Sequence, residues 1–314
     1  MATASIPVDL FNPGQVFACL GFLEAADELL GDAEGGFDWS DDSKVRFHLN
    51  AAGEQNPFEF ALTYLAEAKM LRVAPNGYTD PPTKKKGNVS SEDEEDEPSS
   101  PGDLELSEVF SSGHGDRMAL PIRLRTCDQS HVDVGHWADG STRNEFKLYA
   151  GNRSAFSIAK AMLYGTWEKP KKRQVIGDIK TRGIKALWAD NRETLIAKPF
   201  DVLTLMGGSF NLDPRGGWMS IDAGYSPNKH KHHGVAASPT VEFFAAWGLE
   251  HARPDEYDTR QVRYGVWRGL VPPMLARAAL SGADVTRPMR RFRFALALSG
   301  KNKVITFANE EINP

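Results

Sequence analysis

The chain of 314 residues is poor in cysteine, with only Cys19 and Cys127, and has no apolar run long enough to span a bilayer. Two cysteines cannot build a disulfide framework, so we expect a cytoplasmic protein without membrane contact. The N-terminus also lacks the pattern of a signal peptide, because Asp9 interrupts it early. Cys19 lies in an apolar run, where a buried structural thiol is expected.

Catalytic and cofactor-binding signatures are also missing. The sequence contains no P-loop, no dinucleotide-binding glycine pattern and no nucleophile elbow. The carboxylates Asp213, Asp222 and Glu242 have no spacing typical of a paired-acid or two-metal site. Three histidines, with lysines between them, lack the partners of a zinc site; they are His230, His232 and His233. We therefore expect no metal, no cofactor and no catalytic activity.

Charge divides the chain into three parts. Residues 1–75 carry 12 acidic and 4 basic side chains, residues 76–102 carry 7 and 3, and residues 103–314 carry 23 and 30. The net charge of −5 thus hides a basic C-terminal two-thirds with a net charge of +7. Basic charge attracts nucleic acid, because bound cations displace the condensed counterions of the phosphates. An acidic partner protein is the competing explanation.

Residues 1–75 are expected to form an acidic α+β unit. Hydrophobic periodicity predicts strand, helix, strand, strand and helix, at residues 6–11, 15–30, 37–39, 45–49 and 58–71. Gly31 fits a C-cap of the first helix, whose acids Glu24, Asp27 and Glu28 are expected mostly on its outer side.

Residues 76–102 are expected to be a disordered charged linker. The segment holds the lysine triplet 84–86 and the acidic run 92–97, which cannot be buried. A nucleic-acid mimic or an assembly tail is the alternative interpretation.

Residues 103–314 are expected to form a basic α+β domain. Strands are predicted at residues 104–106, 120–125, 261–268, 291–298 and 304–307, and helices at 154–167, 174–190 and 239–251. The predicted fold class is therefore α+β, with mixed strands and helices and no regular βαβ series.

Three basic clusters lie in or beside predicted loops, at residues 169–173, 228–233 and 287–293. Long side chains on loops can reach phosphates or base edges. The candidate nucleic-acid-binding residues are Lys171, Lys172, Arg173, Arg215, Asn228, Lys229, Lys231, Arg290, Arg291 and Arg293. Nearby aromatic side chains that could stack on bases are Trp167, Trp218, Tyr225 and Phe292. Solvated charges and core aromatics are the alternative.

Four blocks resemble a known family. Residues 7–21 (PVDLFNPGQVFACLG) resemble the opening of a CRISPR-associated protein of type I-G systems, formerly called I-U. Residues 210–226, 241–249 and 264–267 are also similar. The family is the large subunit of the type I-G Cascade effector complex.

The resemblance implies a non-catalytic subunit at one end of a crRNA-bearing complex. Such a subunit would contact the crRNA 5′ handle and other Cascade subunits, read the protospacer-adjacent motif on target double-stranded DNA, and help recruit a helicase-nuclease. Base pairing would supply the sequence specificity, and the protein would supply backbone contacts and a short duplex readout. In that role Asn228, Lys229 and Arg215 are the first candidates for groove contacts.

Two other functions stay open. A crRNA-processing endoribonuclease could use His230, His232 or His233 as acid–base groups. An assembly scaffold would contact protein alone.

Overall fold

The computed structural model describes residues 1–75, 104–107, 122–126, 130–134, 146, 148–149, 155–168, 178–216, 235–250, 252–285, 288–299 and 302–311. Its helices are α1 (Pro13–Leu30), α2 (Pro57–Glu67), α3 (Ala155–Tyr164), α4 (Ile184–Ala197), α5 (Pro239–Gly248) and α6 (Pro273–Leu280), with a short 3-10 helix η3 (Pro214–Gly216). Its strands are β1 (Ala2–Pro7), β2 (Glu34–Asp38), β3 (Arg46–Ala51), β4 (Lys69–Pro75), β5 (Leu104–Ser107), β6 (Ile122–Arg125), β7 (His131–Val134), β8 (Gly165–Trp167), β9 (Ile179–Arg182), β10 (Thr204–Leu205), β11 (Ala236–Ala237), β12 (Asp255–Asp258), β13 (Gln261–Trp267), β14 (Met289–Ser299), β15 (Asn302–Ile305) and β16 (Asn309–Glu310). The fold class is α+β, as the sequence predicted.

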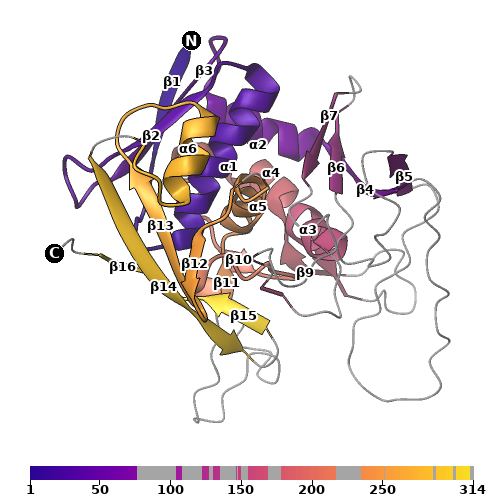
Figure 1. The fold of residues 1–314 in the computed structure, drawn as a ribbon. Coiled ribbons are helices and arrows are strands. Elements are labelled where there is room, and N and C mark those ends of the chain that lie inside the picture. The colour runs from indigo at the N-terminus through magenta and orange to yellow at the C-terminus, as the bar shows by residue number, and fades with distance from the viewer. Residues whose placement is uncertain are drawn as a thin grey trace, which may run out of the picture.

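Helix α1 runs through the middle of the molecule, with the sheet of β12 to β16 on one side and α3 and α5 on the other (Figure 1). All residues from Pro13 to Ala26 are buried, which is typical of a helix at the centre of a core. Asn12 caps its start, because the side-chain Oδ1 accepts a hydrogen bond from the backbone N of Gln15 at 3.2 Å. Gly31, with φ of 83°, ends the helix as predicted.

Helices α1 and α5 cross in direct backbone contact. Gly21 lies against the carbonyl of Phe244, and Gly248 lies against the carbonyl of Phe17, so a Cβ at either glycine would overlap a carbonyl oxygen. Beside this crossing, Phe22 stacks on Phe244 with ring centroids 3.7 Å apart. The contact joins a helix near the N-terminus to one encoded more than two hundred residues later.

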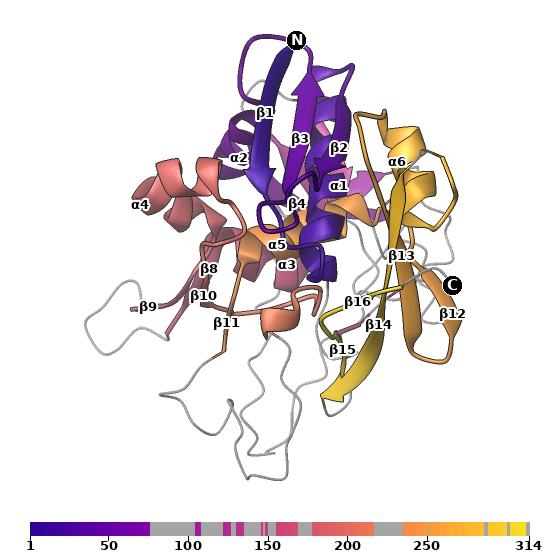
Figure 2. The ribbon, with the colours of Figure 1, turned by 90° about the vertical axis from the view of Figure 1, so that its left-hand side faces the viewer.

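Two antiparallel sheets pack around α1. The first has the strand order β1-β3-β2, and the second has the order β12-β13-β14-β15, with β16 also paired to β14. Their edges meet, because Gly35 of β2 forms a bridge with Val271, and Trp267 Nε1 donates to the Gly35 carbonyl at 2.8 Å. Figure 2 shows the two sheets side by side.

The remaining strands of the described residues form three further sheets at the other side of the helices. One has the order β5-β4-β6-β7, in which β4 and β5 are parallel. β8 pairs with β9, and β10 pairs with β11, both antiparallel. β10 also contacts β9, which brings these two short ribbons together.

Residues 1–75 share one hydrophobic core with the later elements. The core cluster takes side chains from α1, α2, α5, α6 and the two sheets that pack around α1. Across this core, Tyr264 Oη donates to the Leu10 carbonyl at 2.6 Å. The charge boundary between residues 1–75 and 103–314 therefore does not separate two hydrophobic cores. The predicted charged linker, residues 76–102, lies outside the described residues.

Most predicted elements are present with shifted ends. Counterparts exist for the strands predicted at residues 37–39, 45–49, 104–106, 120–125, 261–268, 291–298 and 304–307 and for the helix at 239–251. The first strand was predicted at residues 6–11, but it spans Ala2–Pro7. Helix α6 was not predicted from the periodicity.

The helix predicted over residues 58–71 is shorter than expected, since α2 ends at Glu67 and β4 follows. Lys185 of α4 explains the early end. Its Nζ donates to the carbonyls of Ala66 and Ala68 at 2.7 and 2.8 Å, which satisfies the free acceptors of the last turn. The chain can then leave as a strand that pairs with β6.

The helices predicted over residues 154–167 and 174–190 are partly wrong. Helix α3 ends at Tyr164, where Gly165 adopts φ of 86° and starts β8. Part of the second range forms β9, and α4 begins only at Ile184. Pairing between β8 and β9 depends on residues far apart in sequence, which a local periodicity does not reveal.

Two predictions about α1 have different outcomes. Cys19 is fully buried, as expected of a structural thiol, and burial raises its pKa. Glu24, expected on the outer side, is instead buried and forms an ion pair with Arg277 of α6, with 2.6 Å between Oε1 and Nε. The reason is that α6 covers this side of α1.

The helix crossing leads to a first prediction. Gly21→Ala should lower the free energy of unfolding by about 2 kcal/mol or more, because the new Cβ must push α5 away from α1. Urea unfolding measures this change, with exposed Lys160→Ala on α3 as a control that should stay within about 0.5 kcal/mol of wild type. Equal stability of the two variants would contradict a close backbone contact.

Candidate nucleic-acid interface

A buried carboxylate organises the region behind several candidate residues. Ser238 caps α5, since its Oγ accepts from the backbone N of Val241 at 3.2 Å, and Pro239 begins the helix. Glu242 follows in the first turn, where the helix dipole favours an acid, and it is fully buried.

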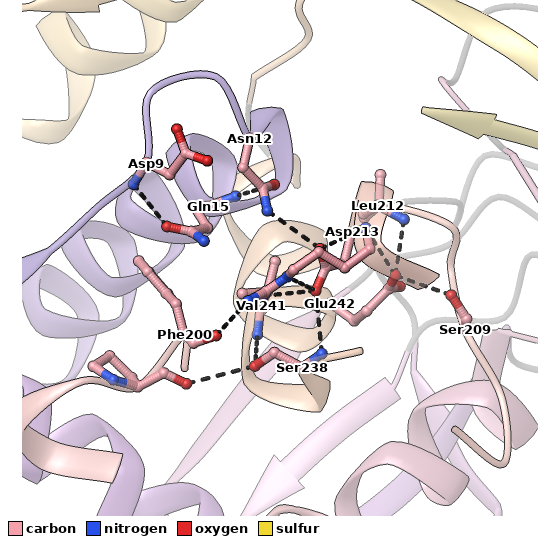
Figure 3. Close-up of polar contacts among 12 residues, drawn as sticks. Asp9, Asn12, Gln15, Phe200, Ser209, Leu212, Asp213, Ser238, Val241 and Glu242 are labelled. Carbon is pink, nitrogen blue, oxygen red and sulfur yellow. Dashed lines mark hydrogen bonds and ion pairs between the residues drawn. The ribbon is translucent and has the colours of Figure 1, made fainter. Parts of the chain in front are cut away.

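The Glu242 carboxylate holds the loop of residues 209–213 by four hydrogen bonds (Figure 3). Its donors are Ser209 Oγ at 2.9 Å and the backbone N atoms of Phe210, Leu212 and Asp213 at 2.7, 3.0 and 2.9 Å. Burial raises the pKa of Glu242 from 4.5 to about 7, and the nearby Asp213 carboxylate adds to the rise. The hydrogen bonds from Ser209 and the backbone oppose this rise.

Asp213 is the second buried carboxylate of the network. It accepts from Asn12 Nδ2 at 3.3 Å and from the backbone N of Ser238 at 3.1 Å. It also forms an ion pair with Arg215, with 2.8 Å between Oδ2 and Nη2. Arg215 Nη1 donates to the Phe200 carbonyl at 2.8 Å. The guanidinium of Arg215 is thus bound within the protein, which gives this candidate base-reading residue a structural role.

This network joins the sequence blocks that carry the family resemblance. Asn12 comes from the first block, Asp213 from the second and Glu242 from the third, while Tyr264 of the fourth donates to Leu10. Because Asp213 and Glu242 are buried, they have no open face toward a substrate. The blocks therefore hold the fold together at this point.

Sequence reasoning named Asp213 and Glu242 but did not join them. They lie 29 positions apart, and no spacing rule links a loop acid to an acid in a helix. An available signal was the setting of Glu242, a charged residue in an otherwise apolar helix.

The network also fixes both ends of the segment 217–234. η3 contacts β11, and a Cβ on Gly216 would lie 3.0 Å from the Cβ of Ala237. The candidates Asn228, Lys229 and Lys231 lie in this segment, outside the described residues. The same is true of His230, His232 and His233 and of the aromatic candidates Trp218 and Tyr225.

The candidates Lys171, Lys172 and Arg173 also lie outside the described residues. The described chain places the two ends of their segment together. The backbone N of Glu168 donates to the carbonyl of Asp178 at 2.8 Å, directly beyond the pairing of β8 with β9.

Acidic side chains of the N-terminal elements neutralise several arginines of the C-terminal elements. Ion pairs between these two parts of the described chain are Glu24–Arg277, Asp42–Arg290 at 2.6 Å, Glu59–Arg192 at 2.7 Å and Asp38–Arg268 at 3.8 Å. The two charge classes of the sequence are therefore interleaved in space, and part of the positive excess is used inside the molecule.

Two candidate arginines of β14 are engaged in ion pairs. Arg290 Nε lies 2.7 Å from Glu310 Oε1, and its guanidinium also lies over the rings of Trp39 and Phe292. Arg291 Nη2 lies 2.8 Å from Asp284 Oδ1. Phe292, named as a possible stacking residue, is fully buried, so its ring cannot meet a base.

Arg293 differs from its neighbours. Its side chain is exposed, and within residues 288–299 and their described surroundings it has no ion pair or side-chain hydrogen bond. It lies opposite Arg263 in the β13–β14 register. Arg263 is compensated by Glu311, with 2.8 Å between Nε and Oε2, and lies over the Tyr257 ring. Arg293 is thus placed to take an external anion.

Searches for a metal site, for a membrane-spanning helix and for similar proteins add no functional assignment. In the part of the chain that the structure describes, no group of three or more His, Cys, Asp or Glu side chains could hold a metal ion. None of the described helices combines the length and the apolar character needed to cross a membrane. No family model, curated protein or solved structure matches the chain.

The buried network leads to a second prediction. Glu242→Gln should lower the free energy of unfolding by about 1–3 kcal/mol, because an amide group would then face backbone donors. Since the pKa of Glu242 is raised from 4.5 to about 7, the stability that this group contributes is full below pH 4.5 and is lost as pH rises to about 7. The advantage of wild type over the variant should therefore shrink across that interval.

Urea unfolding of both proteins at several pH values measures this difference. Burial also raises the pKa of Glu28 to about 7. Because Glu28 is present in both proteins, its contribution to the pH dependence cancels in the difference between them. A stability difference that stays constant from pH 4.5 to 7 would contradict the raised pKa of Glu242.

Proposed function

We propose that the chain is a non-catalytic, nucleic-acid-binding subunit of a crRNA-guided CRISPR interference complex, with the role of a type I-G Cascade large subunit. In this role it binds the crRNA handle, recognises the protospacer-adjacent motif on duplex DNA and helps recruit a helicase-nuclease. The proposal places the protein in the cytoplasm and gives it other Cascade subunits as partners.

The observation that carries the proposal is the open arginine on β14. Arg290, Arg291 and Arg263 all have carboxylate partners, whereas exposed Arg293 has none among the described residues. It lies in the part of the chain that holds the whole positive excess. An exposed guanidinium without an internal partner is suited to bind a phosphate in a bidentate manner.

Two further observations support the proposal. The basic runs 169–173 and 228–233 belong to the longer segments 169–177 and 217–234, and the described residues on either side of each segment are held by the fold. The buried acids of the network face inward, so they do not repel a phosphate backbone at the surface. The endoribonuclease alternative depends on histidines outside the described residues, and it becomes an outcome of the test.

Subunit omission tests the function as a whole. Target-duplex binding by the reconstituted effector should be lost without this chain, together with its dependence on the bases that flank the target. Electrophoretic mobility shifts on duplexes with varied flanks measure both effects. If target binding is unchanged without the chain but the guide RNA stays unprocessed, the proposal is wrong and the chain is the crRNA-processing ribonuclease.

Arg293→Gln tests the phosphate contact within that function. The variant should weaken target binding about tenfold at physiological salt, and the slope of log affinity against log salt should fall by about 1. Arg268→Gln removes the same charge from an exposed arginine that has Asp38 as a partner, and it should bind as wild type. Wild-type affinity and slope for Arg293→Gln would exclude Arg293 as a phosphate ligand.

A further inference from the structure

The loop before α6 and the start of this helix expose an apolar surface, which we call the α6 patch. Its members Leu270, Met274 and Leu275 are 40%, 70% and 36% exposed, and Pro272 is exposed between them. A single exposed apolar side chain, such as Trp167 of β8 at 47%, is normal on a protein surface. Several of them close together in the chain form a patch, which more often marks a contact surface.

The hydrophobic core does not require these side chains. Helix α6 contacts α1, β2 and β13, and it buries Pro273, Ala276, Ala279 and Leu280. Figure 2 shows the helix at the outside of the molecule, beside β2 and β13. The most exposed member of the α6 patch is Met274, and methionine is enriched at protein interfaces because its flexible thioether adapts to a partner.

Backbone and side-chain contacts hold the α6 patch in a fixed position. The backbone N of Val271 donates to the carbonyl of Gly35 at 3.0 Å, and the backbone N of Gly35 donates to the carbonyl of Val271 at 2.9 Å. On α6, Arg277 Nε lies 2.6 Å from Glu24 Oε1, which ties the helix to α1. A surface that is already ordered loses little conformational entropy when it binds a partner.

Acidic side chains lie along one edge of the α6 patch. Gly35 and Val271 form an antiparallel bridge, which places Glu34 opposite Pro272. Asp32 lies in the turn before Glu34 and is exposed. That turn follows α1, which has no basic side chain in its last turn, so the negative end of the helix dipole adds to the charge of these acids.

No basic side chain neutralises this edge within the described residues. Neither Asp32 nor Glu34 forms an ion pair there. Of the two arginines that flank the α6 patch in sequence, Arg268 pairs with Asp38, and Arg277 is the residue tied to α1. The α6 patch is therefore an apolar surface with an acidic edge.

The charge of this edge selects among the possible occupants. It would repel the phosphates of a nucleic acid or of an anionic membrane. A second copy of the chain, bound about a two-fold axis, would bring the same acids into the interface from both sides, because both copies then use the same surface. A protein surface that carries apolar side chains beside lysines or arginines is complementary to the α6 patch in both respects.

We propose that the α6 patch binds a basic protein surface of a neighbouring subunit, with Met274 as the apolar anchor and Glu34 at the charged edge. The proposal rests on the proposed function, which gives the chain other subunits of the effector as partners. The chain then uses an apolar surface with an acidic edge for protein and an exposed arginine of β14 for nucleic acid.

Met274→Ser tests the apolar anchor. The probe is the effector reconstituted without this chain and immobilised for biolayer interferometry, and the full chain is added in solution. The variant should bind about tenfold more weakly, because it loses the apolar area that the partner would cover. Leu298→Ser, which removes an exposed leucine near the end of β14, should bind as wild type.

Both positions are exposed, so both variants should unfold at the urea midpoint of wild type. Wild-type affinity for Met274→Ser would overturn the proposal. Equal weakening by the two variants would also overturn it, because the loss would then not be specific to the α6 patch.

Glu34→Gln tests the charge of the occupant in the same assay. The variant should associate severalfold more slowly than wild type at low salt and equally fast at high salt, because a charge at the edge of an interface acts mainly on the association rate. Glu193→Gln makes the same change at an exposed glutamate of α4 and should associate as wild type. An unchanged or faster association of Glu34→Gln would show that the occupant is not basic, which overturns the proposal.

Two further measurements separate the remaining outcomes. Sedimentation of the isolated chain should show a monomer; a wild-type dimer that Met274→Ser dissociates would assign the α6 patch to self-association and overturn the proposal. If the effector needs the chain for target binding but Met274→Ser joins it as wild type does, the docking surface fails alone. If the wild-type chain does not join the effector, the proposed function fails and the proposed partner with it.

Discussion

The carboxylate of Glu242 is the interaction on which the rest of the structure depends. It stands at the start of α5, and its four donors come from a loop about thirty residues earlier. Through Asp213 the same network reaches Asn12, at the start of α1, so the two central helices begin at one polar point in an apolar core. A buried carboxylate is stable in such a place only when its oxygen atoms receive hydrogen bonds. This requirement fixes the start of α1, the loop of residues 209–213 and the start of α5 relative to one another.

Internal charge pairing determines which basic side chains are open to a partner. Arginines are common in the last sixty residues, yet most of those described are held by carboxylates, several of them from the N-terminal elements. Pairing of this kind stabilises the contact between distant parts of the chain and also hides positive charge. Arg293 differs from its neighbours on β14 because it lacks this compensation among the described residues. In a protein whose net charge is negative, an exposed basic side chain without an internal carboxylate partner therefore indicates an anionic partner better than the net charge does.

The class of the fold and most of its elements were predictable, because each depends on local periodicity. The predictions failed where distant residues decide the outcome. Lys185 ends α2 from another helix, and the paired strands β8 and β9 replace the end of one predicted helix and part of the next. The site shows the same division. The sequence named Arg293 and Trp167 as candidates, but their exposure depends on strand register. The internal bonds of Arg215 and the burial of Phe292 depend in the same way on the network and core around them.

The central place of α1 has a consequence for synthesis of the protein. The helix is buried on every side along most of its length, and its main partner, α5, emerges from the ribosome more than two hundred residues later. Until then the side of α1 that meets α5 has no native surface to cover it, although Phe22 can already pack on Phe58 of α2. Folding must therefore wait for nearly the whole chain, at a high cost in loop closure, and the nascent protein is exposed to aggregation or dependent on chaperones during that time.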